Sequence, residues 1–222
     1  MKLAVFDAGG GRLGEIDGAD EVFGIEPNRS VLHQAYVAQM ANRRAGGAHT
    51  LRRGEVAGST AKIRRQKGLG RSRQGGIRAS HQVGGGVAHG PRPHSFAKDL
   101  PRQMGRLALR SALSSHAASG SLMVVQGLAP TDVKTKTLVA ALQALGIARR
   151  ALIVTGPHVA DLTRAARNIE NAKVVPAANL NVVDVINAHS LLMSEEAVRA
   201  CEALWGGANV KPARGRMREA AR

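Results

Sequence analysis

The sequence predicts an α/β fold: a three-layer globular domain with a mostly parallel sheet covered by helices, plus a long extended basic loop and a basic C-terminal tail. Three observations lead to this prediction. Short, continuously apolar runs alternate with segments of helical periodicity, which is typical of parallel strands buried on both faces. Residues 43–98 interrupt this alternation with no periodicity of either kind, and residues 211–222 are basic again.

The N-terminal part of the body is predicted to hold two short strands and one helix. Residues 1–6 and 12–16 have the apolar pattern of strands. A helix then begins with Ser30 as its N-cap. It leads into the basic segment at Arg43, and four apolar residues lie on one of its faces: Leu32, Ala35, Tyr36 and Met40.

After the basic segment, helices and strands alternate. Residues 101–116 form a predicted helix that Gly120 stops, ahead of an apolar strand at 122–125. A helix at 134–145, closed by Gly146, precedes a second buried strand at 151–156. The remaining predicted elements are a helix near 158–167, a strand at 173–177 and a helix at 194–204.

Charge divides the chain in the same way as periodicity. The 222 residues include 32 Lys or Arg and 16 acidic residues, a net charge of +16. Residues 43–98 carry +12 and residues 211–222 carry +4, so residues 1–42 and 99–210 are neutral as a set. We therefore predict a discontinuous domain of residues 1–42 and 99–210, a Gly/Arg-rich RNA-binding loop at 43–98 and a basic tail at 211–222. Such an imbalance predicts a polyanionic partner.

Several classes of protein are disfavoured by composition. A single cysteine, Cys201, leaves no disulfide framework or cysteine zinc site within the chain, and its helical position indicates core packing. The apolar run at the N-terminus is too short for a secretory signal, and no stretch is long enough to span a membrane. The basic segment is too glycine-rich for an amphipathic surface helix, so we expect a soluble, intracellular protein without membrane contact.

Catalytic and cofactor motifs are sparse. Residues 9–14 fit G-x-G-x-x-G, but the next residues include two carboxylates and a glycine and do not open a helix, so a hairpin turn is favoured over a dinucleotide site. The histidines of the basic segment have only Glu55 as an acidic neighbour, which favours a chance cluster over a metal site: His49, His81, His89 and His94. We predict no catalytic residue, no cofactor and no metal. An RNA-modifying enzyme with a basic insertion is the rival hypothesis.

The basic segment has the composition of an RNA-binding element. Ten of its 13 basic residues are arginines, whose planar guanidinium bonds phosphate with two parallel hydrogen bonds and stacks on bases. Phe96 is its only aromatic residue, which disfavours a base-stacking platform and leaves recognition by phosphate and shape. The predicted RNA-binding residues here are Arg43, Arg44, Arg52, Arg53, Lys62, Arg64, Arg65, Lys67, Arg71, Arg73, Arg78, Arg92 and Lys98.

The predicted helix after this segment adds three arginines. Arg102, Arg106 and Arg110 recur every four residues, opposite the apolar face, and are predicted to form one stripe of phosphate contacts. A solvated helix face is the alternative for this stripe.

The chain resembles a known family over nearly its whole length: the fourth protein of the large ribosomal subunit, in its bacterial form. The three motifs that carry this resemblance best are RRQKGLGRSR at 64–73, GGGVAHGPRP at 84–93 and LALRSALS at 107–114. Three shorter matches follow in the family's order, KTKT at 134–137, AARN at 165–168 and LNVVDV at 180–185. The chain departs from the family at Leu69, where members often have Thr, and at residues 81–83, which lack an aromatic before the triple glycine.

The resemblance implies a structural role in the large subunit. Expected partners are 23S ribosomal RNA, bound early in assembly, and neighbouring large-subunit proteins, without homo-oligomers. The resemblance also implies that the loop reaches the polypeptide exit tunnel and meets the nascent polypeptide. The tunnel-lining tip carried over onto this chain is Gln66, Lys67, Gly68, Leu69, Gly70, Arg71, Ser72 and Arg73.

Overall fold

Two structural units make up the chain in the computed structural model, which describes residues 1–128, 134–147 and 149–207. Met1–Gln39 and the chain from Asp99 onward form one unit, called the body below. Met40–Lys98 form the second, called the basic unit. The predicted basic tail at 211–222 lies outside the described residues.

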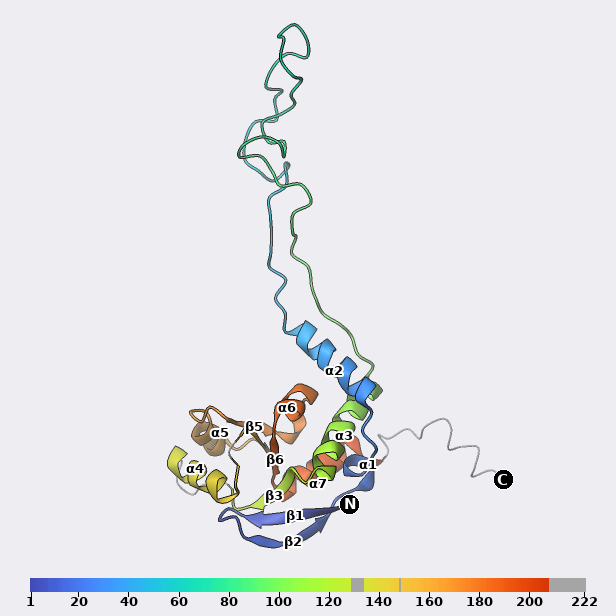
Figure 1. The fold of residues 1–222 in the computed structure, drawn as a ribbon, viewed down its shortest axis with the longest axis vertical. Coiled ribbons are helices and arrows are strands. Elements are labelled where there is room, and N and C mark those ends of the chain that lie inside the picture. Colours follow the sequence, from blue (N-terminus) through green and yellow to red (C-terminus); the bar gives the residue numbers. More distant parts are fainter. Residues whose placement is uncertain (129–133, 148, 208–222) are drawn as a thin grey trace, which may run out of the picture. The chain divides into compact units, whose positions relative to one another are not determined.

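One six-stranded sheet runs through the body in the order β2-β1-β3-β6-β4-β5 (Figure 1). Neighbouring strands are parallel except β2, which pairs antiparallel with β1. The mostly parallel α/β sheet predicted from the sequence is therefore confirmed. The strands are β1 (Lys2–Asp7), β2 (Arg12–Asp17), β3 (Leu122–Gln126), β4 (Ala151–Thr155), β5 (Ala172–Pro176) and β6 (Ser190–Met193).

Helices cover both faces of this sheet. Leu152 and Val154 of β4 join a core with α1, α3 and α7, whereas Ile153 between them joins a second core with α4 and α5. This alternation along one strand places the two cores on opposite faces of the sheet. The helices are α1 (Asp20–Phe23), α2 (Arg29–Asn42), α3 (Arg102–Ala118), α4 (Thr135–Ala144), α5 (Ala160–Ala166), α6 (Val182–Asn187) and α7 (Glu195–Trp205), with a 3-10 turn at Ala177–Asn179.

The G-x-G-x-x-G motif forms the hairpin turn between β1 and β2. The Gly10 amide donates to the Asp7 carbonyl at 2.9 Å, and the Asp7 amide donates to the Gly11 carbonyl at 2.8 Å. Gly10 has φ +83°, and a Cβ there would collide with the Ala144 carbonyl. The hairpin interpretation is confirmed, because β2 and not a helix follows the glycines.

Gly120 ends α3 as predicted, Ser194 is a cap that was not predicted, and the predicted N-cap of α2 needs a correction. Gly120 has φ +70° and closes α3, and Ser194 caps α7 by accepting from the Ala197 amide at 3.1 Å. The N-cap of α2 is Asn28 and not Ser30. The Asn28 side chain accepts from the Val31 amide at 3.2 Å, and the helix already begins at Arg29.

Three elements of the body are absent from the predicted set: α1, α6 and β6. Of these, β6 matters most, because it lies between β3 and β4 and joins the two halves of the sheet. Among the described residues, no helix combines the length and the apolar character needed to cross a bilayer.

Candidate nucleic-acid interface

The basic unit is held together by hydrogen bonds between its two halves. The Thr50 amide donates to the Pro91 carbonyl at 3.1 Å, and the Val87 amide donates to the Leu51 carbonyl at 2.8 Å. Past the end of α2, the unit has no helix and no strand beyond one isolated antiparallel bridge. It is therefore a paired, irregular segment whose own backbone contacts are few.

Glycines let the two halves approach each other. Gly86 is buried, and a Cβ there would collide with the backbone of Arg53. A Cβ at Gly46 would collide with the His94 carbonyl in the same way. Close backbone approach thus explains why residues 46 and 86 are glycines. Gly86 is the last of the triple glycine at 84–86, which forms no phosphate-loop motif.

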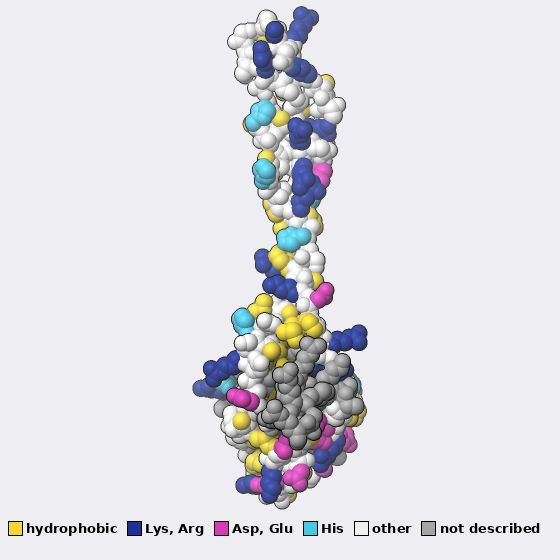
Figure 2. Space-filling view, turned by 90° about the vertical axis from the view of Figure 1, so that its right-hand side faces the viewer, with side chains coloured by type: hydrophobic (Ala, Val, Ile, Leu, Met, Phe, Trp, Pro, Cys, Tyr) yellow, Lys and Arg dark blue, Asp and Glu magenta, His cyan; other side chains and the backbone are white. Residues whose placement is uncertain are grey.

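Basic side chains are distributed along the whole basic unit, as Figure 2 shows. Ten of the 13 Lys and Arg side chains of residues 43–98 are exposed, and Arg64, Arg78 and Arg92 are half-buried. The ten exposed side chains are Arg43, Arg44, Arg52, Arg53, Lys62, Arg65, Lys67, Arg71, Arg73 and Lys98.

Three of the arginines are positioned by the protein itself. Arg78 Nη1 donates to the Val56 carbonyl at 3.1 Å, and Arg92 Nη2 donates to Glu55 at 2.5 Å. The guanidinium of Arg44 lies over the Phe96 ring, with Cζ 3.9 Å from the ring centroid. A guanidinium fixed in this way loses less freedom when it binds a ligand than a freely rotating one.

A small hollow in the basic unit has the donor groups that suit an oxyanion. Its volume is about 200 Å³, and Arg53, Arg78, Ser59 and Thr60 contribute to its lining together with Gly54, Gly76 and Ala79. No carboxylate is among these lining residues. Guanidinium and hydroxyl donors without a competing acceptor match a phosphate group. Ser59 and Thr60 were not predicted from the sequence as binding residues. The only feature of the sequence that could have indicated them is that two hydroxyl residues follow Gly58.

The predicted tip, residues 66–73, is exposed at every position. Its base is closed by the Ile63 amide, which donates to the Gly75 carbonyl at 3.1 Å. Gly68 and Gly70 have φ +86° and +60°, and Leu69 between them is 48% exposed. The two glycines permit a turn that presents an apolar side chain to the surroundings.

The arginine stripe on α3 needs a correction. Arg102 is exposed and Arg106 is half-buried, but Arg110 is only 9% exposed. Its Nε has no hydrogen-bond partner among the described residues. Burial lowers the pKa of Arg110, and the nearby Glu21 carboxylate opposes that effect. The prediction of one exposed stripe is therefore wrong for Arg110, which packs inside the body.

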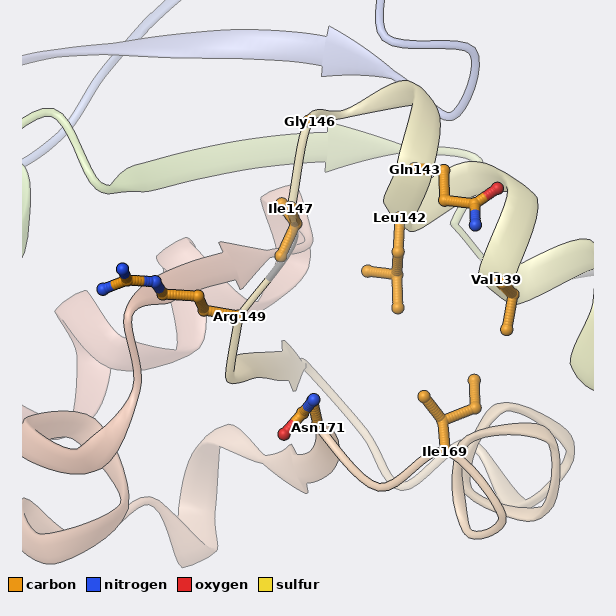
Figure 3. Close-up of a pocket in the computed structure, with 8 residues that line it drawn as sticks. All are labelled: Val139, Leu142, Gln143, Gly146, Ile147, Arg149, Ile169 and Asn171. Atoms are coloured by element: carbon orange, nitrogen blue, oxygen red, sulfur yellow. The ribbon is translucent and has the colours of Figure 1, made fainter.

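One cavity of the body has a mostly apolar lining. It measures about 530 Å³, and Figure 3 shows Val139, Leu142, Ile147 and Ile169 around it. Arg149 is the single ionisable side chain among its lining residues. The lining thus offers no acid, base or nucleophile.

A second hollow of the body lies at the carboxyl ends of β3, β4 and β6, where α/β enzymes bind ligands. It measures about 330 Å³, and Glu195 and Glu196 are its two acidic lining residues. In the described part of the chain, no group of three or more His, Cys, Asp or Glu side chains is placed to hold a metal ion. Cys201 is fully buried, as predicted, and burial raises its pKa to about 12, so it is no activated nucleophile.

Comparison with known proteins gives matches over most of the chain. The model of a family described as the ribosomal protein L4/L1 family matches residues 16–204. The large ribosomal subunit protein uL4 of Dehalococcoides mccartyi is 43% identical over 206 residues, which are 93% of this chain and 98% of that protein. The uL4 proteins of Desulfatibacillum aliphaticivorans and Brevibacillus brevis are 42% and 43% identical over 201 residues, 90% of this chain and 97% of each relative.

Proposed function

Since this chain belongs to the ribosomal protein L4/L1 family, we propose that it is a structural constituent of the large ribosomal subunit and not an enzyme. Its primary ligand is 23S ribosomal RNA, and its other partners are neighbouring large-subunit proteins. It acts in the cytoplasm, within the ribosome, as a single copy. It binds RNA early in subunit assembly.

One observation carries this proposal: the charge of the chain is concentrated in the basic unit. Residues 43–98 carry 13 basic residues and one acid, while the described body has a balanced charge pattern and a complete apolar core. A segment this basic and this poor in apolar contacts gains order from a polyanion, because each phosphate contact releases condensed counterions. The body then serves as the folded base of an RNA-binding element.

Phosphate recognition supplies the mechanism. The exposed arginines offer planar forks to non-bridging phosphate oxygens, and the hollow between Arg53 and Arg78 accommodates one phosphate with hydroxyl donors at its rim. On the body, the exposed Arg102 and the half-buried Arg106 offer the same chemistry. These contacts hold the protein on RNA through shape and charge rather than through base edges.

The tip at residues 66–73 has a separate role in this proposal. It lines the polypeptide exit tunnel, where Leu69 meets the nascent polypeptide. The exposure of all eight tip residues and the two left-handed glycines support this assignment. The arginines on either side of the tip anchor it in RNA.

Sedimentation of a tagged chain in cell lysate tests the proposal. We expect the protein to co-sediment with large subunits and to stay there in high salt. A variant with Arg53→Gln and Arg78→Gln should shift toward the free pool at lower salt than the wild type. Arg164→Gln, a neutralised body arginine paired with Asp161, is the matched control. A wild-type chain found only in slowly sedimenting fractions contradicts the proposal.

A further inference from the structure

Three flat side chains meet within the basic unit. The guanidinium of Arg44 stacks on the Phe96 ring with Cζ 3.9 Å from its centroid. The His94 ring packs against the same Phe96 at 4.3 Å between centroids, tilted by 59°. Phe96 is the only aromatic residue of residues 43–98, and it is thus covered by two partners.

Antiparallel pairing of the two halves of the unit builds this cluster. Asn42 accepts from the Lys98 amide at 2.7 Å and donates to the Lys98 carbonyl at 3.3 Å. The His94 amide donates to the Gly46 carbonyl at 3.2 Å. Arg44 and Phe96 lie between these two contacts in both segments, so the register of the pairing places them opposite each other.

The cluster leaves binding groups open. Phe96 is half-buried, but Arg44 and His94 are exposed. The Arg44 guanidinium lies over the Phe96 ring, with Cζ 3.9 Å from the ring centroid, so the ring covers the guanidinium on one side. Within the described residues, no hydrogen bond or ion pair is made by the Arg44 side chain. The exposed Arg44 thus has N–H groups that no acceptor among the described residues occupies.

We infer that Arg44, backed by Phe96, is a stacking site for an unpaired RNA base, an inference that rests on the proposed RNA-binding function. An RNA base that leaves its helix exposes a flat apolar face, and proteins bind such faces with aromatic rings or guanidinium planes. Phe96 holds the guanidinium in one orientation before RNA arrives, which lowers the entropy cost of stacking.

Charge alone does not account for this arrangement. A phosphate contact uses the N–H edge of an arginine, so an aromatic ring beneath the guanidinium can orient that edge but leaves the guanidinium plane itself unused. A base stacks on the planar guanidinium itself, which the ring beneath it holds in position. The scarcity of aromatic residues disfavoured base stacking in the sequence analysis. One aromatic ring is enough, however, when the guanidinium of an arginine stacks on it and offers its other face to a base. His94 adds a second exposed plane beside it.

The experiment compares two RNA probes bound to the full-length protein. One is a single-stranded oligoadenylate of about twelve nucleotides that carries one 2-aminopurine. The other is a blunt RNA duplex with the same number of phosphates and no unpaired base. Affinity is measured for both probes at one salt concentration, and 2-aminopurine fluorescence reports stacking.

Arg44→Lys keeps the charge and removes the plane. We expect it to weaken binding of the single strand by about tenfold, to leave duplex affinity nearly unchanged and to abolish most of the 2-aminopurine quenching. Arg43→Lys is the matched control. It changes the adjacent arginine in the same way, and the ratio of single-strand to duplex affinity should remain that of the wild type.

Phe96 variants test the backing ring. Phe96→Leu should lower single-strand affinity selectively, as Arg44→Lys does, whereas Phe96→Tyr should retain both affinity and quenching. If Arg44→Lys weakens both probes equally, or behaves as Arg43→Lys does, Arg44 is a phosphate contact and the stacking inference fails. If the wild-type protein binds neither probe, the proposed RNA-binding function fails with it.

Discussion

Glu55 accepts a hydrogen bond from Nη2 of Arg92 at 2.5 Å, so the only acidic side chain of residues 43–98 pairs with an arginine 37 positions away. Its other carboxylate oxygen accepts from the Arg52 amide at 2.9 Å. The hydrogen bond from that amide and the one from Arg92 lower the pKa of Glu55 below its ordinary value of 4.5. Although the charge of the basic unit favours a polyanionic ligand, Glu55 uses its negative charge to stabilise contacts within the unit.

Acid should loosen the turn that Glu55 holds. Because its pKa is lower in the folded unit than in the unfolded chain, the contribution of Glu55 to stability is present at neutral pH and is lost as pH falls below 4.5. The Val56 amide, which donates to the Arg52 carbonyl, reports on this turn in hydrogen exchange. Its protection should decrease below pH 4.5 in the wild type.

Glu55→Gln is the control for this titration. It keeps an oxygen acceptor for the Arg52 amide but removes the charge, so protection of Val56 should already be reduced at neutral pH and should not change through the acid range. Protection in the wild type that is independent of pH would show that the ion pair does not order the turn.

The first two arginines of α3 should contribute to the salt dependence of RNA binding. We expect log affinity to fall with log salt with a slope steeper than about −2, since many phosphate contacts release counterions. Neutralising Arg102 and Arg106 together should reduce the steepness by about 1.5, at roughly 0.7 to 0.9 for each phosphate that is no longer neutralised. Titrations of fluorescent RNA at several salt concentrations measure this slope. An unchanged slope would mean that neither arginine contacts phosphate, and Arg164→Gln controls for loss of charge elsewhere on the body.

Arg110 should respond differently from its neighbours on α3. Its buried Nε lacks a hydrogen-bond partner among the described residues, so no hydrogen bond offsets the desolvation of that atom there. Replacement by Met keeps the aliphatic packing and should stabilise the protein by about 1 kcal/mol. Thermal denaturation followed by circular dichroism should show a rise of about 2 to 4 °C. Arg102→Met, at an exposed position, should leave the transition where it is, and a lower transition for Arg110→Met would show that the guanidinium is needed for stability.

The helix geometry explains why the sequence misplaced Arg110. A spacing of four residues turns by about 40° relative to a straight row on an α-helix, so Arg110 lies about 80° around the helix from Arg102. That rotation carries it to the side of α3 where Glu21 of α1 is near enough to affect its pKa, and α1 was not predicted as a helix. Periodicity identified the exposed face of α3. The boundary of that face depends on the packing of α1 against α3, which the sequence did not predict.

The missed elements α6 and β6 have local causes. Val182, Val183 and Val185 are β-branched and favour strands, yet α6 forms because the Asn181 side chain accepts from the Asp184 amide at 2.8 Å and caps the helix. The four residues of β6 are too few to show a period. The long strands and helices were predictable because each contains a full apolar pattern.

The contact between Arg44 and Phe96 was beyond sequence analysis for another reason. Nothing in residues 43–98 has the two-residue alternation that specifies strand register. The register depends instead on the Asn42 side chain, which pairs with Lys98, and on the close approach at Gly46. Basic character could be predicted residue by residue, whereas the pairing of two distant positions could not.

Cys201 should be unreactive in the native protein. With a pKa of about 12, fewer than about one thiol in a thousand is ionised at pH 8. Dithionitrobenzoate should therefore react only after denaturation, and the signal is unambiguous because the sequence has one cysteine.

Since the folded pKa lies above the unfolded value of 9.0, the buried thiol favours the folded state below pH 9 and loses that contribution as pH rises toward 12. A Ser115→Cys variant, exposed on α3, should react at once. Rapid reaction of the wild type would show that α7 opens readily.

The last prediction concerns the tip at residues 66–73. If Leu69 faces the tunnel lumen, substitutions from Lys67 to Arg71 should alter susceptibility to macrolides, which bind inside the tunnel. Deletion of residues 68–72 should leave subunit assembly largely intact, because the base of the tip is closed by the Ile63 and Gly75 backbones and the anchoring arginines lie on either side.

Both classes of tip variant are tested in cells that depend on this protein, with macrolide susceptibility measured beside subunit profiles. Arg53→Gln with Arg78→Gln is the matched comparison, because it removes an anchor without touching the tip and should reduce the large-subunit peak. The deletion removes Leu69 and both left-handed glycines but leaves six residues to join Ile63 to Gly75, enough to close a turn. Loss of large subunits with unaltered susceptibility in the tip variants would make the tip an assembly anchor and remove it from the tunnel wall.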